Sequence, residues 1–269
     1  MKREGALYYR DLPWRGIDDA YAVLVSEVML QQTQVKRVLG YWPRFLKAFP
    51  TIDALAAAST SDVLELWQGL GYNRRALLLK RCADECAATH AGVLPSTADE
   101  LVKLPGLGPA TAAGVVAFAF DKPSLYLETN VRTVFLHELF PGREGVKDSE
   151  IAPLVELSCP QKDVRAWYYA LLDYGAHLKA TMPNPSRRSA HHARQSEFEG
   201  SRRQKRAELV RIVLAAGTEG VSVKQALRAL DQVEKRGGRE AVDPGEASSI
   251  VNDLLAEGFF RQVGDVLVP

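Results

Sequence analysis

The sequence predicts an all-α body made of several packed helices. Apolar segments with helical capping residues follow one another up to about Met182, and strand signals are nearly absent before the C-terminus. The 269 residues are 46% hydrophobic, which is enough for a large core and for more than one domain. We therefore expect a multi-helix fold followed by a smaller unit of different composition.

Capping and apolar residues define the helices of the body. Asp18 and Asp19 precede the first apolar run, residues 59–61 can cap another helix, and Ser96 with Asp99 resembles a capping box. The predicted helices cover residues 21–30, 42–49, a segment ending at 68, 74–89 and 109–120.

The C-terminal unit has the order of a winged helix. Helices are predicted over residues 205–216, 222–231 and 244–257, and residues 259–268 alternate about a Gly-Asp turn like a hairpin. Such a unit binds either DNA or a protein. Its third helix is acidic, which argues against strong binding in a DNA groove; the acids are Asp243, Glu246, Asp253 and Glu257.

Composition and net charge limit the partners, the compartment and the metal sites that this protein can have. The net charge of +1 means that any affinity for nucleic acid must come from local patches. No signal peptide or membrane-spanning run is present, which predicts a cytoplasmic protein. The three cysteines, Cys82, Cys86 and Cys159, fit a reducing compartment and make a poor metal site without matching ligands.

Glu27 lies in an almost unbroken apolar helix, 21–30. A charged carboxyl is rarely tolerated there without a partner, and burial raises its pKa toward the range of a general acid. A second acid, Glu128, follows an apolar stretch in Leu127-Glu-Thr-Asn-Val-Arg132. Cleavage of an N-glycosidic bond needs one acid to protonate the leaving base and another, ionised, to stabilise the developing oxocarbenium charge.

The segment Leu104-Pro-Gly-Leu-Gly-Pro-Ala-Thr-Ala112 predicts a tight turn between two helices. Backbone amides at the turn and at the next helix N-terminus can hold a DNA phosphate without reading bases. Together with the two acids, this pattern resembles the helix-hairpin-helix (HhH-GPD) DNA glycosylases, and most closely the MutY-type adenine DNA glycosylases. The resemblance runs from about Arg10 to Gly175 and includes Ser26-Glu-Val-Met-Leu-Gln-Gln-Thr33, which is specific for that branch.

The resemblance implies roles for particular positions. Glu27 matches the acid that protonates adenine, and Glu128 matches the catalytic Asp. Residues matching the pocket of the extruded base are Arg10, Leu12, Trp14, Arg15 and Asp173. Residues matching or suggested as DNA contacts are Gln31, Gln32, Tyr72, Asn73, Leu104, Gly106, Gly108, Ala110, Thr111, Asn130, Arg187 and Arg188. The last two belong to a basic segment, 183–194, which is either a solvated linker or a set of phosphate contacts.

The resemblance also implies an architecture. It predicts a two-lobed fold, with a six-helix-barrel domain carrying the helix-hairpin-helix at 17–124 and a second helical lobe formed by 1–16 and 125–200. Residues 201–269 form the winged-helix-like domain. A structural Na, K or Ca ion bound by backbone oxygens of the helix-hairpin-helix is expected, with no metal ligands from side chains.

Four features depart from the family pattern. Glu128 replaces the catalytic Asp, and Ala110 stands where bifunctional relatives carry a Lys, so no amine is available there for a Schiff base. The family usually has four cysteines that hold an iron–sulfur cluster, but residues 177–203 contain none, which predicts a clusterless member. Asn73 replaces a Tyr that wedges beside 8-oxoguanine, and the C-terminal unit replaces the usual Nudix-like recognition domain.

These observations favour a monomeric, nucleoid-associated monofunctional glycosylase that needs no cofactor. It would flip a mispaired or damaged base from double-stranded DNA and leave an abasic site. Adenine opposite 8-oxoguanine or G is the leading substrate. Two alternatives stay open: excision of another base, such as uracil, thymine in a G mismatch or hypoxanthine, and catalytically silent binding of distorted DNA.

Overall fold

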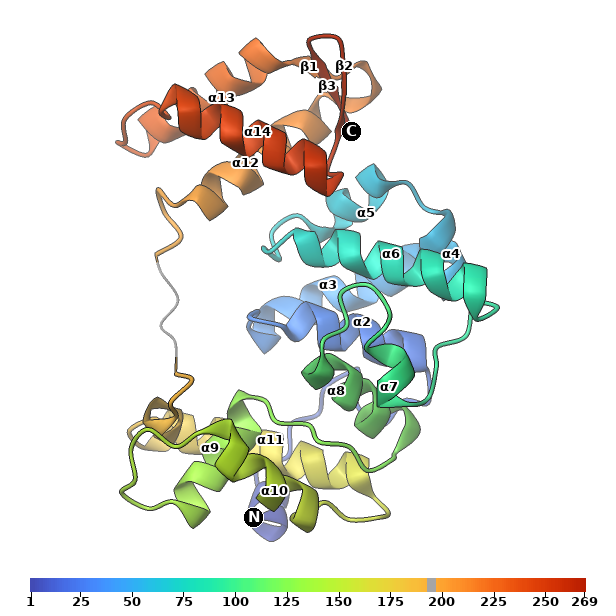
Figure 1. The fold of residues 1–269 in the computed structure, drawn as a ribbon, viewed down its shortest axis with the longest axis vertical. Coiled ribbons are helices and arrows are strands. Elements are labelled where there is room, and N and C mark those ends of the chain that lie inside the picture. Colours follow the sequence, from blue (N-terminus) through green and yellow to red (C-terminus); the bar gives the residue numbers. More distant parts are fainter. Residues whose placement is uncertain (193–196) are drawn as a thin grey trace. The chain divides into compact units, whose positions relative to one another are not determined.

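The computed structural model describes residues 1–192 and 197–269, and it confirms the predicted helical fold (Figure 1). Residues 193 and 194, the end of the predicted basic segment, lie outside the described residues. The chain forms two compact units, Met1–Gln31 with Val93–Arg194 and Gln32–Gly92 with Gln195–Pro269. These units group elements by packing, and the three predicted domains stay a prediction.

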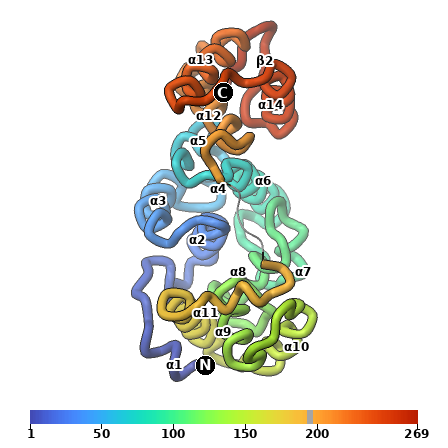
Figure 2. Tube along the Cα trace, turned by 90° about the vertical axis from the view of Figure 1, so that its left-hand side faces the viewer, coloured from blue at the N-terminus to red at the C-terminus, as the bar shows by residue number. Residues whose placement is uncertain are grey.

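The first unit is helical. Its longest helix, α11 (Val164–Thr181), packs against α9 (Thr129–Leu139) and α1 (Lys2–Ala6), as Figure 2 shows. Its other elements are α2 (Ala20–Leu30), α7 (Ala98–Leu101), α8 (Pro109–Phe120), α10 (Asp148–Ser158) and the short η1 (Pro185–Arg188). The helices α2 and α8 pack on each other, because both are apolar on nearly all sides.

Aromatic side chains fill the core beside the segment that leads into α9. The Phe118 ring stacks on Tyr169 with centroids 5.0 Å apart and meets Tyr126 edge-on at 5.1 Å. The Tyr168 hydroxyl donates to the carbonyl of Ser124 at 2.5 Å and accepts from the Tyr126 amide at 3.0 Å. These two bonds satisfy buried backbone groups of an irregular segment, so the chain entering α9 has a defined course.

The second unit begins with α3 (Val35–Ala48), α4 (Ile52–Ala57), α5 (Thr60–Trp67) and α6 (Arg74–Thr89). The predicted 74–89 helix is confirmed, but the 42–49 prediction missed about two turns at the N-terminal end, because α3 begins at Val35 and continues through Pro43. The capping prediction at Ser96 was also wrong. Thr97 is the N-cap of α7 and its hydroxyl bonds Glu100, while Ser96 accepts from the Lys122 ammonium at 3.0 Å.

The C-terminal elements of this unit are three helices and a small sheet. They are α12 (Arg202–Ala215), η2 (Gly217–Glu219), β1 (Val221–Ser222), α13 (Val223–Arg236), α14 (Pro244–Glu257), β2 (Arg261–Val263) and β3 (Val266–Val268). The strands are antiparallel in the order β1-β3-β2. The winged-helix assignment of these elements stays a prediction.

Among the described residues, no helix combines the length and the apolar character that crossing a membrane requires.

A substitution at Gly175 tests how closely the backbones of α11 and α9 approach each other. A Cβ at this position would overlap the backbone carbonyl of Asn130. We expect Gly175→Ala to lower the free energy of unfolding by about 1–3 kcal/mol, despite the better helix propensity of Ala. The matched control is Gly40→Ala in α3, where a Cβ meets nothing within 4 Å and should stabilise by about 1 kcal/mol. Urea unfolding measures both, and equal effects would contradict the close approach.

Candidate active site

Glu27 is half-buried in α2, where its neighbours on the helix are apolar and buried. The helix begins at Asp19, whose side chain accepts the amide of Ala22 at 3.0 Å. The pKa of Glu27 is raised to about 8, mainly by burial; a hydrogen bond from Tyr126 opposes the rise, and the charge of Glu128 adds to it. The carboxyl is therefore largely protonated at neutral pH, as the apolar context predicts.

Gly114 in α8 makes room for this carboxyl. A Cβ on Gly114 would overlap Oε2 of Glu27 and would lie 2.9 Å from Cε2 of Tyr126. Any side chain there would displace the acid, the phenol or both. The absence of a side chain at Gly114 thus serves this site directly.

Tyr126 is one of two site residues that sequence reasoning missed. Its side chain is buried, and its hydroxyl donates to the Glu27 carboxylate. Burial raises the pKa of Tyr126 well above its ordinary value, and the charges of Glu27 and Glu128 raise it further, so the phenol keeps its proton. The only sequence signal was a tyrosine in the apolar stretch directly before Glu128.

Glu128 is the N-cap of α9. Its Oε1 accepts the amide of Asn130 at 2.6 Å and that of Val131 at 3.2 Å. Burial raises its pKa, while these amides and the nearby cations Lys179 and Arg132 lower it in part. Amide donors and cations favour the charged form of Glu128, and Glu27 has no such cation among the causes of its shift.

The structure thus brings Glu27 and Glu128 together around Tyr126, and their catalytic roles stay a prediction. Lys179 of α11 is a third charged residue of this site, and its charge acts on Glu128. Burial lowers the pKa of Lys179 and the Glu128 carboxylate opposes that shift. No sequence pattern pointed to this lysine, because it is separated from Glu128 by two helices.

Asp173 anchors the N-terminal segment. This carboxylate is 1% exposed and accepts from the Arg10 amide at 3.1 Å and from Arg10 Nε at 2.5 Å. Arg15 binds it in a bidentate manner at 2.7 and 2.8 Å and also lies 4.5 Å from the centroid of the Tyr169 ring. These four bonds occupy the acceptor capacity of Asp173, so in this state its role is to hold residues 10–15 in place.

The other residues predicted for the base pocket lie in the same segment. Leu12 and Trp14 are both buried. Two of the predicted DNA contacts lie elsewhere in this unit: Arg187 is exposed on η1, and Arg188 donates to the carbonyls of Phe140 and Leu136 at 2.5 and 2.7 Å. Arg188 therefore caps the C-terminal end of α9, and its guanidinium is engaged in that cap.

The predicted helix-hairpin-helix turn joins α7 to α8. Leu104 is buried, Gly106 has φ +78°, which favours glycine, and Gly108 is the N-cap of α8. Ala110 is exposed in the first turn of α8. Gln31 reaches this hairpin, because its Nε2 donates to the Thr111 hydroxyl at 2.9 Å, and this bond ties the end of α2 to α8.

The remaining predicted residues fall into two places. Asn130 donates its backbone amide to Glu128, and its Oδ1 is buried without a hydrogen-bond partner in the described part of the chain. Gln32, Tyr72 and Asn73 belong to the second unit. Gln32 and Tyr72 have φ values of +54° and +49°, which are uncommon for residues with a side chain.

The donor set does not fit a four-thiolate iron–sulfur cluster. The three cysteines are buried and unpaired by disulfides, and residues 177–203 contain none. Within residues 1–192 and 197–269, no three His, Cys, Asp or Glu side chains gather as a metal site. An ion held by backbone oxygens at the helix-hairpin-helix stays a prediction.

The model of the HhH-GPD superfamily base excision DNA repair proteins matches residues 25–161. The chain belongs to this superfamily. The matched range of this HhH-GPD protein contains Glu27, the hairpin and Glu128.

Individual proteins extend the comparison. The adenine DNA glycosylase of Mycobacterium tuberculosis is 48% identical over 128 residues, which are 47% of this chain and 42% of that protein. The adenine DNA glycosylase of Mycolicibacterium smegmatis is 38% identical over 170 residues, 62% of this chain and 58% of that protein. The HhH-GPD chain thus spans about half the length of the curated relatives it matches.

A solved structure of a thermostable thymine-DNA glycosylase has the same fold, with a TM-score of 0.60 and 23% identity. The likeness covers 68% of this chain and 86% of that one. It confirms the predicted glycosylase fold of the HhH-GPD protein.

The raised pKa of Glu27 predicts a pH-dependent cost in stability. The unfolded chain loses this proton near pH 4.5 and the folded chain near pH 8, so stability falls as pH rises between these values. We expect Glu27→Gln to raise the free energy of unfolding at pH 7.5 by on the order of 1–3 kcal/mol and to change it little at pH 4. Urea unfolding across this pH range measures the difference.

The control for this prediction is Glu65→Gln on the exposed side of α5. Its effect should stay below about 0.5 kcal/mol at every pH. A Glu27→Gln difference that does not vary with pH would show that the Glu27 carboxyl titrates normally.

Proposed function

We propose that this protein is a monofunctional DNA glycosylase of base excision repair that removes a mispaired adenine, opposite 8-oxoguanine or G, and leaves an abasic site. The observation that carries the proposal is the pairing of Glu27 and Glu128 at one site in different surroundings. Glu27 is desolvated and protonated near neutral pH, whereas Glu128 receives backbone amides and the charge of Lys179. Such a division between two carboxyls suits acid-assisted cleavage of a glycosidic bond.

In the proposed reaction, the adenine is first extruded from the duplex, since its glycosidic bond is inaccessible in the stack. The Glu27 carboxyl gives its proton to a ring nitrogen of adenine while the C1′–N9 bond breaks and the electron pair leaves with the base. Ionised Glu128 stabilises the positive charge on the sugar. Water then adds to C1′ and gives a proton to the Glu128 carboxylate, which completes hydrolysis; exchange with solvent then deprotonates Glu128 and reprotonates Glu27.

Two features support adenine as the excised base and duplex DNA as the partner. Relatives that are 48% and 38% identical over the matched segments are adenine DNA glycosylases, and the segment 10–15 is held in place by Asp173. The helix-hairpin-helix presents the N-terminal turn of α8, which suits a phosphate of the bound strand. Excision of another base is the alternative, because Glu128 and Asn73 differ from the family pattern.

Hydrolysis without strand cleavage is part of the proposal. Ala110 provides no amine in the hairpin, and Lys179 is one of two cations whose charge acts on Glu128. We assign Lys179 to holding Glu128 in its charged form rather than to attack on the sugar.

Base release tests the proposed function. Duplexes with A opposite 8-oxoguanine, A opposite G, and G opposite U, T or hypoxanthine are incubated with the protein and then treated with alkali to reveal abasic sites. We expect loss of adenine, no strand cleavage before alkali, and no borohydride-trapped adduct. Glu27→Gln should lower the rate of base release by at least about 10²-fold while retaining affinity for the duplex. Release limited to other bases would replace adenine as the substrate, and normal release by the variant would refute the role of Glu27.

Glu128→Asp tests whether the carboxylate alone matters at the second position. Asp is a favourable N-cap, so the start of α9 should be kept. We expect this variant to retain at least about a tenth of the single-turnover rate, whereas Glu128→Gln should lose most of it. A collapse of Glu128→Asp to the level of Glu128→Gln would mean that the site depends on the longer side chain.

A further inference from the structure

Residues of α1, of α11 and of the loops beside α2 and α8 line a cavity of about 660 Å³ in the first unit. Its buried lining consists of Gly5, Tyr169 and Ala170. Glu27 and Glu128 are not among the described residues that line it. A separate cavity of this volume suits a small molecule.

Backbone contacts fix the walls of this cavity. A Cβ on Gly5 would overlap the carbonyl oxygen of Ala170, so the backbone of α1 lies directly on α11. The Gly16 amide donates to the Tyr169 hydroxyl, and Gly16 has φ +66°, a conformation that favours glycine. The walls are therefore set by the fold rather than by mobile side chains.

Tyr9 provides an aromatic surface to the cavity. This residue is 59% exposed and lines the cavity. The Arg15 guanidinium lies 5.4 Å from the centroid of its ring, and both Arg10 and Arg15 are bound to Asp173. The tyrosine therefore belongs to a segment that is held in place, and a planar ligand can stack on its ring.

Arg165 in the first turn of α11 provides a hydrogen-bond donor. Its amide donates to Oδ1 of Asp121 at 2.7 Å, and its Nη1 and Nη2 donate to Asp18 at 3.3 Å and to the carbonyl of Ala119 at 3.1 Å. Its Nε is buried and has no acceptor in the part of the chain that the structure describes. A buried donor without an acceptor is uncommon, and an acceptor atom of a ligand would satisfy it.

Three carboxylates that line the cavity provide acceptors, namely Asp18, Asp121 and Asp163. Asp163 has φ +58° before α11, and its side chain makes no capping bond to that helix. Carboxylates accept hydrogen bonds and donate none when ionised, so they select a ligand that carries N–H or O–H groups.

The charges around the cavity nearly cancel. The three carboxylates of the lining face two cations, Lys2 and Arg165. Arg10 and Arg15 share Asp173. The other charged residues next to the lining along the chain are Arg3, Glu4, Asp19, Lys122 and Lys162. Net charge therefore gives no preference for a phosphate, and hydrogen bonding and stacking decide the ligand.

The position of the cavity also separates it from the DNA expected at the hairpin. Asp121 follows the C-terminal end of α8, whereas Gly108 of the hairpin precedes its N-terminal end. A helix of 12 residues is about 18 Å long. A phosphate held at the first turn of α8 would therefore not reach the cavity.

We propose that this cavity binds a free amino-substituted nitrogen heterocycle, with adenine as the nucleobase of first choice. Its ring would stack on Tyr9, its amino group would donate to a carboxylate of the lining, and a ring nitrogen would accept from Arg165. The choice of adenine rests on the proposed function, which releases that base. A lysine or arginine side chain of a partner protein is the competing occupant, but it has no acceptor for Arg165.

Equilibrium dialysis of labelled adenine against the full chain, without DNA, tests this site. We expect saturable binding that Ala166→Phe weakens at least tenfold, because the larger side chain fills the cavity without changing its charge. The matched control is Ala180→Phe, an exposed position of the same helix that does not line the cavity, and it should leave the affinity unchanged. Thermal unfolding checks that both variants keep the fold.

Ligand analogues test the chemistry without altering the protein. Purine lacks the amino group of adenine and should bind about 5- to 10-fold more weakly, because it leaves a carboxylate without its donor. Adenosine monophosphate should bind no more tightly than adenine. L-Argininamide represents the cationic side chain, and tighter binding of this compound than of adenine would overturn the proposed ligand.

Glu27→Gln separates the cavity from the site of the two carboxyls, and it should leave the dialysis result unchanged. Adenine binding that Glu27→Gln removes and Ala166→Phe keeps would overturn the inference, as would the absence of saturable binding up to about 1 mM adenine. A protein that binds adenine as expected but releases no base from DNA would keep the inference and refute the proposed function. Release of adenine without binding that depends on Ala166 would do the reverse.

Discussion

The burial of two carboxyls around one phenol is the constraint on which the rest of the first unit depends. Glu27 lies in an apolar helix, and burial raises its pKa to about 8, so the carboxyl keeps its proton near neutral pH. Gly114 leaves the space for it, and Tyr126 donates to it. Glu128 is drawn toward its charged form by the amides at the start of α9. Burial raises the pKa of both carboxyls; a hydrogen bond from Tyr126 opposes the rise at Glu27, whereas backbone amides and two cations oppose it at Glu128.

This arrangement is costly in isolation, and the neighbouring structure offsets it. Buried carboxyls without partners reduce stability, and functional sites commonly accept that cost. Asp173 shows the opposite case in the same unit, because four hydrogen bonds from Arg10 and Arg15 satisfy its charge. Asp173 accepts four hydrogen bonds and holds the N-terminal segment against α11. Glu27 and Glu128 accept fewer hydrogen bonds and remain available for chemistry.

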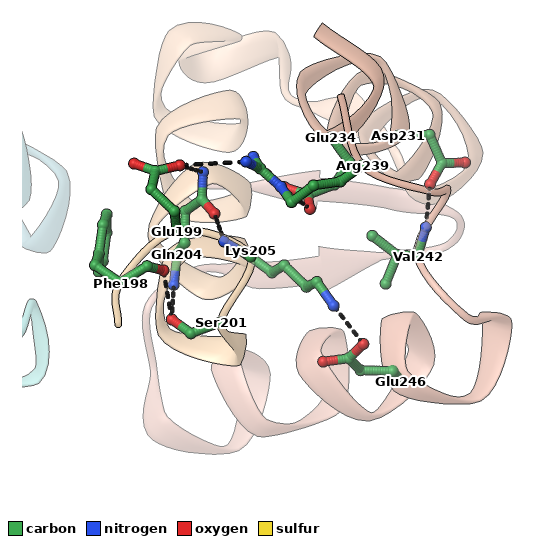
Figure 3. A network of polar contacts seen from close by, with 11 residues as sticks. Phe198, Glu199, Ser201, Gln204, Lys205, Asp231, Glu234, Arg239, Val242 and Glu246 are labelled. Atoms are coloured by element: carbon green, nitrogen blue, oxygen red, sulfur yellow. Dashed lines mark hydrogen bonds and ion pairs between the residues drawn. The ribbon is translucent and has the colours of Figure 1, made fainter. Parts of the chain in front are cut away.

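In the second unit, ion pairs with α12 neutralise two of the acidic residues of α14. An acidic α14 seemed unsuited to DNA, but Glu246 and Asp253 pair with basic residues of α12, and Figure 3 shows the pair of Glu246 with Lys205. The pairing lies between helices that are about 40–50 residues apart, a separation at which sequence spacing carries no information about contact.

The sequence by itself determined the helical class, the helices at 74–89 and 109–120, the hairpin and the two candidate acids, because apolar runs, caps and glycine turns are local properties. It missed Tyr126 and Lys179, assigned the cap of α7 to the wrong residue, and left Asp173 as a pocket residue without its arginine partners. Only the tertiary structure decided these points. Desolvation, charge pairing and the space beside Gly114 arise from residues that are distant along the chain, so no local pattern encodes them.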